Sequence, residues 1–96
     1  MSGHVTFRYS PAALRGLKAH KKAHDSASIA RIGEIQREIE ATWPEPEGRF
    51  MPERLKGDLS GHFSRRVNQR DRYVYSVDEG GRSVYVIQCK GRYSDK

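Results

Sequence analysis

The sequence predicts an α+β fold in which a two-helix hairpin packs on a four-stranded, largely antiparallel β-sheet, in the order β-α-α-β-β-β. Two observations support this prediction. A helical pattern of apolar residues covers residues 11–43, and short strand-like segments lie on either side of it, one before and three after. Because 96 residues have room for one hydrophobic core, residues 1–96 are expected to form a single domain.

The first strand and the first helix have clear local signals. Residues 4–9 alternate between apolar and polar side chains, as a half-buried strand does. Ser10 is a good N-cap and Pro11 suits the first helical position, so a helix is expected from there to about Lys22. The side chains expected to face inward are Ala13, Leu14 and Leu17.

A second, longer helix follows a short break at residues 24–26, where Asp25 and Ser26 are candidate caps. Pro44 and Pro46 end it, because proline removes a backbone donor and restricts the residue before it. The apolar residues recur at steps of three and four, which predicts one buried stripe. They are Ile29, Ile32, Ile35, Ile39 and Trp43.

The second half of the chain is expected to supply the rest of the sheet. Residues 44–62 are a Pro/Gly-rich connection with one short apolar-centred piece at 52–56. Strands are predicted at 63–68, 72–78 and 83–89, separated by turn residues. With the helices on one face, the other face of the sheet is free to form a concave, basic surface.

The charge is unevenly distributed. The net charge is +6 and the pI is about 9.8, values that are typical of a protein that binds a polyanion. The alternative is a soluble protein whose surface is basic without such a ligand. Residues 25–48 carry six acidic and two basic side chains, whereas residues 49–96 carry eleven basic and six acidic ones. A single cysteine excludes an internal disulfide, and no stretch is long and apolar enough for a membrane span. A cytoplasmic protein with no membrane partner is expected.

Most general signatures of chemistry are absent from the sequence. There is no phosphate-binding glycine loop, no dinucleotide motif and no zinc-binding spacing, so neither a metal nor a cofactor is predicted. His20 and His24 lie four residues apart but lack a third ligand, and solvated helix-end histidines are the default interpretation. Cys89 lies in an apolar strand and is interpreted as a core residue.

Arg66 and Arg72 lie at opposite ends of the tight turn at residues 67–71. Hairpin pairing would bring them directly or diagonally opposite, within about 5–8 Å. Two guanidinium groups that close repel each other unless an anion lies between them, and phosphate suits the planar donors of arginine. The alternative is that both pair with surface carboxylates, which would be Asp58, Asp71 or Asp78.

Three sequence blocks carry a resemblance to a known family. Residues 52–67 (PERLKGDLSGHFSRRV), 72–75 (RYVY) and 89–93 (CKGRY) resemble, in order and spacing, the conserved blocks of the RelE superfamily of bacterial toxins, nearest its YoeB/Txe branch. The resemblance is close over residues 52–93, and the first half agrees in element order alone. It implies the RelE-like fold and endonucleolytic cutting of mRNA in the ribosomal A site without a metal. It also implies inhibition by a YefM/Phd-like antitoxin and allows a homodimer.

The resemblance also implies roles for individual residues. Glu53 falls where the family has its general base, and Arg66 and Arg72 match its transition-state arginines. Tyr93 matches a terminal tyrosine that can stack on or orient a base. Further contacts with RNA phosphates are expected from Lys56, Arg65 and Lys90.

Arg92 departs from the family pattern, which has a histidine there as its candidate acid. Arginine stays protonated near neutral pH, so Arg92 is expected to act as a phosphate-binding cation and the group that serves as the acid is left open.

Each assignment has a structural alternative. Glu53 could be an ordinary exposed carboxylate, and Lys56 and Arg65 could be solvated surface cations. Tyr93 could be a frayed tail residue, because the residues that follow it are polar. Core or edge packing is the alternative role of the strand tyrosines, Tyr73, Tyr75 and Tyr85. Two other functions stay open at this point. One is a non-catalytic protein that binds only its antitoxin or another target, and the other is a gyrase-directed (ParE-like) toxin.

Overall fold

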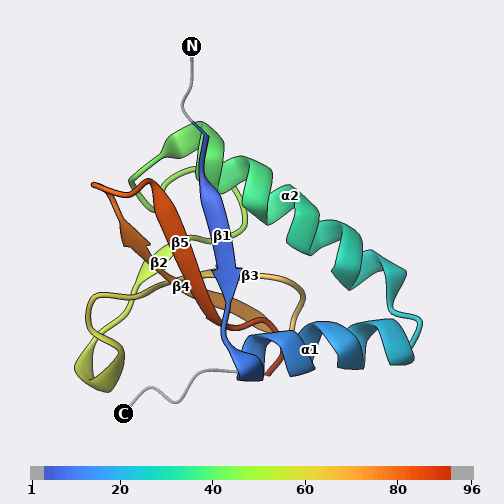
Figure 1. The fold of residues 1–96 in the computed structure, drawn as a ribbon. Helices are drawn as coiled ribbons and strands as arrows, with labels where there is room; N and C mark the ends of the chain where they lie inside the picture. Colours follow the sequence, from blue (N-terminus) through green and yellow to red (C-terminus); the bar gives the residue numbers. More distant parts are fainter. Residues whose placement is uncertain (1–3, 92–96) are drawn as a thin grey trace.

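The structure is a computed structural model that describes residues 4–91 (Figure 1). The chain folds in the predicted order, with one strand and two helices followed by the remaining strands. The elements are β1 (Thr6–Tyr9), α1 (Pro11–Lys22), α2 (Ser26–Thr42), β2 (Glu53–Arg54), the 3₁₀ turn η1 (Gly57–Leu59), β3 (Phe63–Arg66), β4 (Arg72–Asp78) and β5 (Ser83–Gln88).

The sheet has five strands in the order β1-β5-β4-β3-β2, one more than predicted. The additional strand is β2, whose two residues are too few to show a periodic pattern in the sequence. β1 runs parallel to β5, and every other pair is antiparallel, so the prediction of a largely antiparallel sheet is confirmed.

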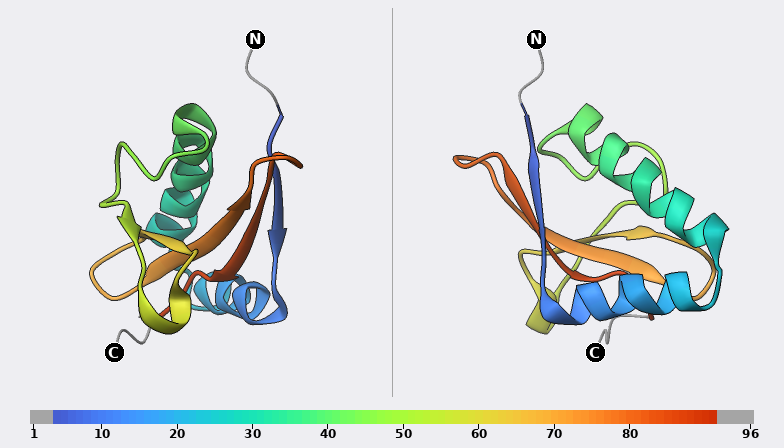
Figure 2. Two further views of the ribbon diagram at one scale, coloured as in Figure 1. Left: turned by 90° about the vertical axis from the view of Figure 1, so that its left-hand side faces the viewer. Right: turned by 45° about the vertical axis from the view of Figure 1, so that its right-hand side comes forward.

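The two helices pack on the sheet in different ways (Figure 2). α2 runs across one face, and α1 lies at the end where β5 finishes. Both predicted caps are confirmed, since Ser10 Oγ accepts from the Ala13 N–H at 3.1 Å and Asp25 Oδ1 accepts from the Ser28 N–H at 3.1 Å. Within residues 4–91, neither helix is long and apolar enough to cross a membrane.

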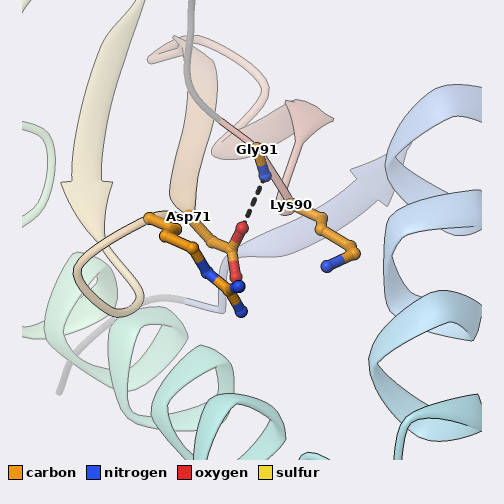
Figure 3. A pocket seen from close by; sticks show the side chains of 4 residues that line it. Asp71, Lys90 and Gly91 are labelled. Atoms are coloured by element: carbon orange, nitrogen blue, oxygen red, sulfur yellow. Dashed lines mark hydrogen bonds between the residues drawn. The ribbon is translucent and has the colours of Figure 1, made fainter.

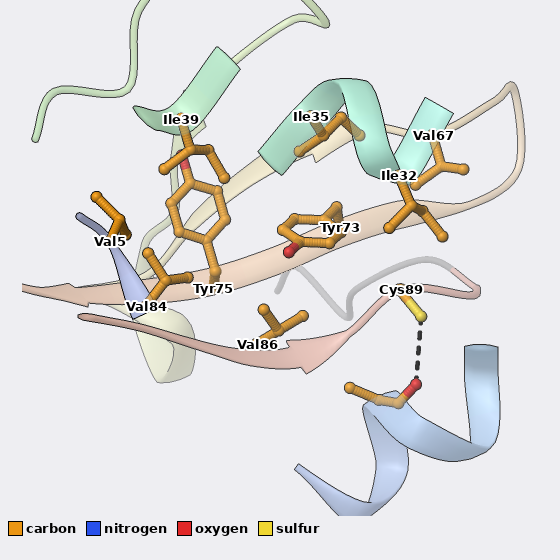
Figure 4. Close-up of a cluster of buried hydrophobic side chains, with 11 residues drawn as sticks. Val5, Ile32, Ile35, Ile39, Val67, Tyr73, Tyr75, Val84, Val86 and Cys89 are labelled. Atoms are coloured by element: carbon orange, nitrogen blue, oxygen red, sulfur yellow. Dashed lines mark hydrogen bonds between the residues drawn. The ribbon is translucent and has the colours of Figure 1, made fainter. Parts of the chain in front are cut away.

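The core lies between α2 and the strands β4 and β5 (Figure 4). α2 contributes the predicted stripe, of which Ile32, Ile35 and Ile39 are buried. Tyr73 and Tyr75 point into the core from β4, which confirms core packing as the role of these two tyrosines. Tyr85 does not pack in the core, because it lies on the open face of β5 and is 45% exposed. Strand alternation explains this difference, because the buried Val84 and Val86 flank Tyr85 in sequence.

The prediction for the inward face of α1 is wrong at one position. Leu14 is 47% exposed, whereas Ala13 is buried and Leu17 packs against the core. The buried stripe continues from these two residues to His20, at steps of four and three. Leu14 falls outside that stripe, so it faces solvent.

His20 is not the solvated helix-end residue that the sequence suggested. It is 1% exposed, and its Nε2 hydrogen-bonds the Cys89 carbonyl at 3.1 Å. Its Nδ1 lies 3.6 Å from Asp25 Oδ2, and its Nε2 lies 4.0 Å from Asp71 Oδ2. His20 therefore joins α1 to the turn before β4 and to the chain that leaves β5.

Cys89 is a core residue, as predicted. Its Sγ donates to the Ala13 carbonyl at 3.3 Å (Figure 4), and burial raises the pKa of the thiol to about 11. The thiolate, which is the nucleophilic form, is therefore scarce at neutral pH.

Candidate active site

The pairing of β3 with β4 brings the two predicted arginines together. Arg66 and Arg72 are direct partners in the register, which confirms that they lie opposite each other across the hairpin. The turn between them is held by the Asn68 side chain, whose Oδ1 accepts from the N–H groups of Arg70 and Asp71, both at 2.8 Å. This local hydrogen bonding sets the register that places one guanidinium opposite the other.

β2 adds a carboxylate to the same face of the sheet. Glu53 is the register partner of Ser64, and Ser64 lies two residues before Arg66 on β3. Because side chains two residues apart on a strand share a face, Glu53 and Arg66 point to the same side. A small groove of about 50 Å³ lies there. Its lining residues are Met51, Glu53, Ser64, Arg66 and Arg72.

The chain enters the groove through a strained segment. Phe50 and Met51 have φ angles of 71° and 54°, a region that side-chain-bearing residues seldom occupy. Phe50 is held in place by its backbone and by its ring. Its carbonyl accepts from the Arg66 N–H at 2.7 Å, and the guanidinium groups of Arg31 and Arg49 lie over its ring, 4.6 and 4.5 Å from the ring centroid. Met51 then lies in the groove with 61% of its surface exposed. Nothing in the sequence marked it as a site residue.

Arg72 is oriented by the turn that precedes it. Its Nη1 donates to the carbonyls of Asn68, Gln69 and Asp71, at 3.0, 3.4 and 3.2 Å. Neither Arg72 nor Arg66 forms a salt bridge with any of the aspartates that were the alternative partners, within the part of the chain that the structure describes. The guanidinium of Arg72 is therefore positioned by neutral carbonyl groups of the turn.

Arg65 is neither an RNA contact nor a solvated surface residue. It is 0% exposed, and all three nitrogens of its guanidinium donate hydrogen bonds to protein oxygens. The acceptors are Tyr75 Oη at 3.2 Å, the Glu47 and Arg49 carbonyls at 2.8 and 3.0 Å, and Thr42 Oγ1 at 3.3 Å. Strand alternation could have revealed this, because Arg65 shares the inward face of β3 with Phe63. Its role is to fasten the connection after α2 to the sheet.

Of the other predicted site residues, Lys56 and Lys90 do not line the groove. Lys56 follows β2 and is exposed, and Lys90 follows β5 and is also exposed. Arg92 and Tyr93 lie outside the described residues, so their predicted roles stay predictions. Within residues 4–91 there is no group of three or more histidine, cysteine, aspartate or glutamate side chains placed to hold a metal ion.

The groove combines two permanent cations with one exposed carboxylate. Paired arginines stabilise negative charge that builds up on a phosphate group, and a carboxylate beside them can accept a proton. The arrangement therefore suits chemistry at a phosphodiester.

Comparison with known proteins gives relatives with similar sequences. The chain is 36% identical over 70 residues to the toxin YoeB of Escherichia coli O6:H1, a match that covers 72% of this chain and 77% of that protein. A second match, to the toxin YoeB of Synechocystis sp., is 40% identical and spans about half of both proteins (49% and 52%).

Solved structures of similar proteins share the whole fold. A YoeB dimer from Staphylococcus aureus aligns with a TM-score of 0.83 and 31% identity, covering 95% of this chain and all of that one. One chain in the structure of the heterotetrameric YoeB–YefM toxin–antitoxin complex from the same organism aligns with a TM-score of 0.81, at the same identity and coverage.

The fold and these relatives define the class of protein, a small toxin of bacterial type II toxin–antitoxin systems. Residues 9–93 match the family described as YoeB-like toxins of such systems. The chain belongs to the YoeB-like toxin family, as its sequence blocks predicted.

Proposed function

We propose that this toxin is a metal-independent endoribonuclease that cuts mRNA in the ribosomal A site. The observation that carries the proposal is the groove in which Arg66, Arg72 and Glu53 meet on one face of the sheet. Family membership supports the toxin role, and the basic net charge of +6 suits an RNA substrate.

The proposed reaction begins at the ribose next to the scissile phosphate. Glu53 accepts the proton of the 2′-OH while the 2′-oxygen forms a bond to phosphorus. Arg66 and Arg72 stabilise the additional negative charge on the phosphorane, and the bond from phosphorus to the 5′-oxygen then breaks. The products are a 2′,3′-cyclic phosphate and a 5′-OH end.

The departing 5′-oxygen takes its proton from a water molecule, because the guanidinium of Arg92 does not release a proton near neutral pH. We assign Arg92 to electrostatic stabilisation and Tyr93 to stacking on a base. Lys56, exposed just after β2, is assigned to the RNA backbone beside the groove.

The proposed partner is a YefM-like antitoxin, and the proposed location is the cytoplasm. A YoeB from Staphylococcus aureus forms a heterotetramer with YefM, and another solved structure is a YoeB dimer, so both assemblies are proposed for this chain. An acidic antitoxin segment that folds onto the basic toxin would cover the positive surface.

Inducible expression in bacteria, followed by primer extension on a known transcript, tests the proposed activity. We expect discrete new 5′ ends at codon boundaries, which disappear when Glu53→Gln is expressed instead. DNA-damage induction without new 5′ ends would overturn the proposal and indicate a gyrase-directed toxin. Toxicity with neither effect would indicate another target.

A further inference from the structure

Met51 differs from the other side chains of the groove because it is apolar, whereas the rest of the described lining is charged or carries a hydroxyl. It is also the most exposed large apolar side chain within residues 4–91. We propose that Met51 is a substrate-positioning residue whose thioether packs against the base of the nucleotide that carries the attacking 2′-OH. The inference rests on the proposed function, because it takes the groove to bind the ribose and the scissile phosphate of RNA.

The backbone at Met51 is held in an unfavourable conformation. Its φ angle is 54°, and it precedes Pro52, a position in which a residue ordinarily takes an extended backbone. The conformation persists because the preceding residue, Phe50, is fixed by the Arg66 N–H and by two guanidinium groups over its ring. The fold gains little burial in return, since 61% of Met51 is exposed. Backbone strain of this kind is concentrated at sites that bind a ligand, so it points to a contact outside the fold.

Met51 and Glu53 lie on the same side of the groove, at the edge of the sheet. Glu53 belongs to the edge strand β2, and Met51 follows Phe50, whose carbonyl accepts from the Arg66 N–H of β3. The two arginines of the groove come from β3 and β4, farther from that edge. An RNA whose scissile phosphate lies on the arginines and whose 2′-OH faces Glu53 therefore has the ribose at the edge of the sheet. The base on that ribose is the part of the nucleotide that is left to contact Met51.

The chemistry of a thioether also favours the base as its contact. Sulfur packs favourably against aromatic rings, and the unbranched methionine side chain adapts to rings of different size. Phosphate and ribose are polar, and a thioether is only a weak hydrogen-bond acceptor for them. In single-stranded RNA the bases can be splayed out, so their faces are accessible to a side chain. A base held by Met51 fixes the ribose attached to it, which helps to align the 2′-oxygen with the phosphorus.

The proposal is tested by single-turnover cleavage on ribosomes programmed with synthetic mRNA. At the cleavage site that primer extension maps, the nucleotide with the attacking 2′-OH either keeps its base or is abasic. An abasic nucleotide retains the ribose and the 2′-OH but presents no ring to Met51. The variants are Met51→Ala, which removes the thioether, and Met51→Leu, which keeps an apolar side chain of similar volume. Leu14→Ala, which removes another exposed apolar side chain on α1, is the matched control.

We expect Met51→Ala to cut the mRNA that has the base about tenfold more slowly than the wild type, as the loss of a good sulfur–aromatic contact would produce. On the abasic mRNA, Met51→Ala and the wild type should cut at the same reduced rate, because the contact is already absent from both. Met51→Leu should keep most of the wild-type rate on the mRNA that has the base. Leu14→Ala should match the wild type on both substrates.

An equal loss of rate by Met51→Ala on both mRNAs would overturn the proposal, because it would show that Met51 supports the shape of the groove and not the base. Wild-type rates for Met51→Ala on both mRNAs would also overturn it and would leave the proposed cleavage intact.

If the wild type cuts neither mRNA, the proposed function fails, and binding decides the inference separately. The probes are ribosomes that carry the same two mRNAs with a 2′-deoxy sugar at the nucleotide under test, and the quantity measured is the Kd of the toxin. Weaker binding of Met51→Ala to the probe with the base, but not to the abasic probe, would support the contact. Equal binding of Met51→Ala and the wild type to the probe with the base would overturn it.

Discussion

The groove at Glu53 can be compared with a second cleft of about 400 Å³, which is lined by Arg70, Asp71, Lys90 and Gly91 (Figure 3). Both contain two cations and one carboxylate, but they differ in where the carboxylate lies. Glu53 is exposed on a two-residue strand at the edge of the sheet. Asp71 is buried, and hydrogen bonds to Gly91 and Asn68 occupy both of its oxygens.

The difference shows that burial decides what a carboxylate can do beside two cations. Hydrogen bonds and the nearby positive charges hold Asp71 in its ionised form as part of the framework. A carboxylate that faces the groove can instead exchange a proton with a substrate. We therefore expect substitutions in the groove to change the reaction rate, and substitution of Asp71 to change stability.

The largest effect is expected for the arginines of the groove. Arg66→Gln or Arg72→Gln should lower the single-turnover rate of mRNA cleavage on programmed ribosomes by two to three decades, or about 3 kcal/mol, because each removes a charge contact from the transition state. Arg37→Gln on α2 is the control and should keep the wild-type rate. Full activity in folded Arg66 and Arg72 variants would show that the groove is not the reaction centre.

Arg65 and Arg66 are neighbours in sequence and should give opposite results. Arg65→Met should lower the free energy of unfolding by about 3 kcal/mol, because it leaves the buried carbonyls of Glu47 and Arg49 without donors. Arg66→Met, at an exposed position, should change it by less than about 0.5 kcal/mol. Urea titration of both variants measures the difference, and equal stabilities would contradict a structural role for Arg65.

Asp71→Asn is expected to cost about 2 kcal/mol of stability at neutral pH, because an amide replaces the charged acceptor of the Gly91 N–H. Asp58→Asn, at an exposed position, is the control and should have little effect. Equilibrium unfolding in urea at pH 7 measures the stability of both variants. Wild-type stability in Asp71→Asn would contradict the structural role that separates the Asp71 carboxylate from the Glu53 carboxylate.

The pH dependence of stability gives an independent check on Asp71. Burial raises its pKa, but the hydrogen bonds from Gly91 and Asn68 and the charges of Lys90 and His20 outweigh that effect, so the net pKa is lowered. A carboxyl whose folded-state pKa is lowered contributes stability above its unfolded pKa of about 3.9, and that contribution is lost as the pH falls through the folded value. The stability gap between wild type and Asp71→Asn should therefore narrow below about pH 4. A gap that stays constant to pH 2 would contradict this account.

The smallest expected effect is a change in the shape of a pH profile. Arg92→His should introduce a fall in cleavage rate on the alkaline side of about pH 6.5, as the imidazole loses its proton. The wild type should show no such fall, and Arg92→Ala should be slower at every pH. Single-turnover cleavage between pH 5.5 and 9 decides this, and equal rates for wild type and Arg92→Ala would rule out a role for Arg92.

Local sequence signals determined most of the architecture. The caps at Ser10 and Asp25, the stripe of isoleucines in α2 and the end of α1 at Lys22 all follow from neighbouring residues. The opposition of Arg66 and Arg72 was also predictable, because a tight turn relates the residues on either side of it. Such features depend on contacts within a few positions along the chain.

Tertiary contacts alone decided the remaining features. β2 exists because its two residues pair with β3, and Met51 reaches the groove because Phe50 is held by Arg66 and two stacked guanidinium groups. The burial of His20, Arg65 and Asp71 likewise depends on acceptors and donors far away in sequence. A polar side chain is stable inside a protein only when distant groups satisfy it, and a pattern of neighbouring residues does not contain that information.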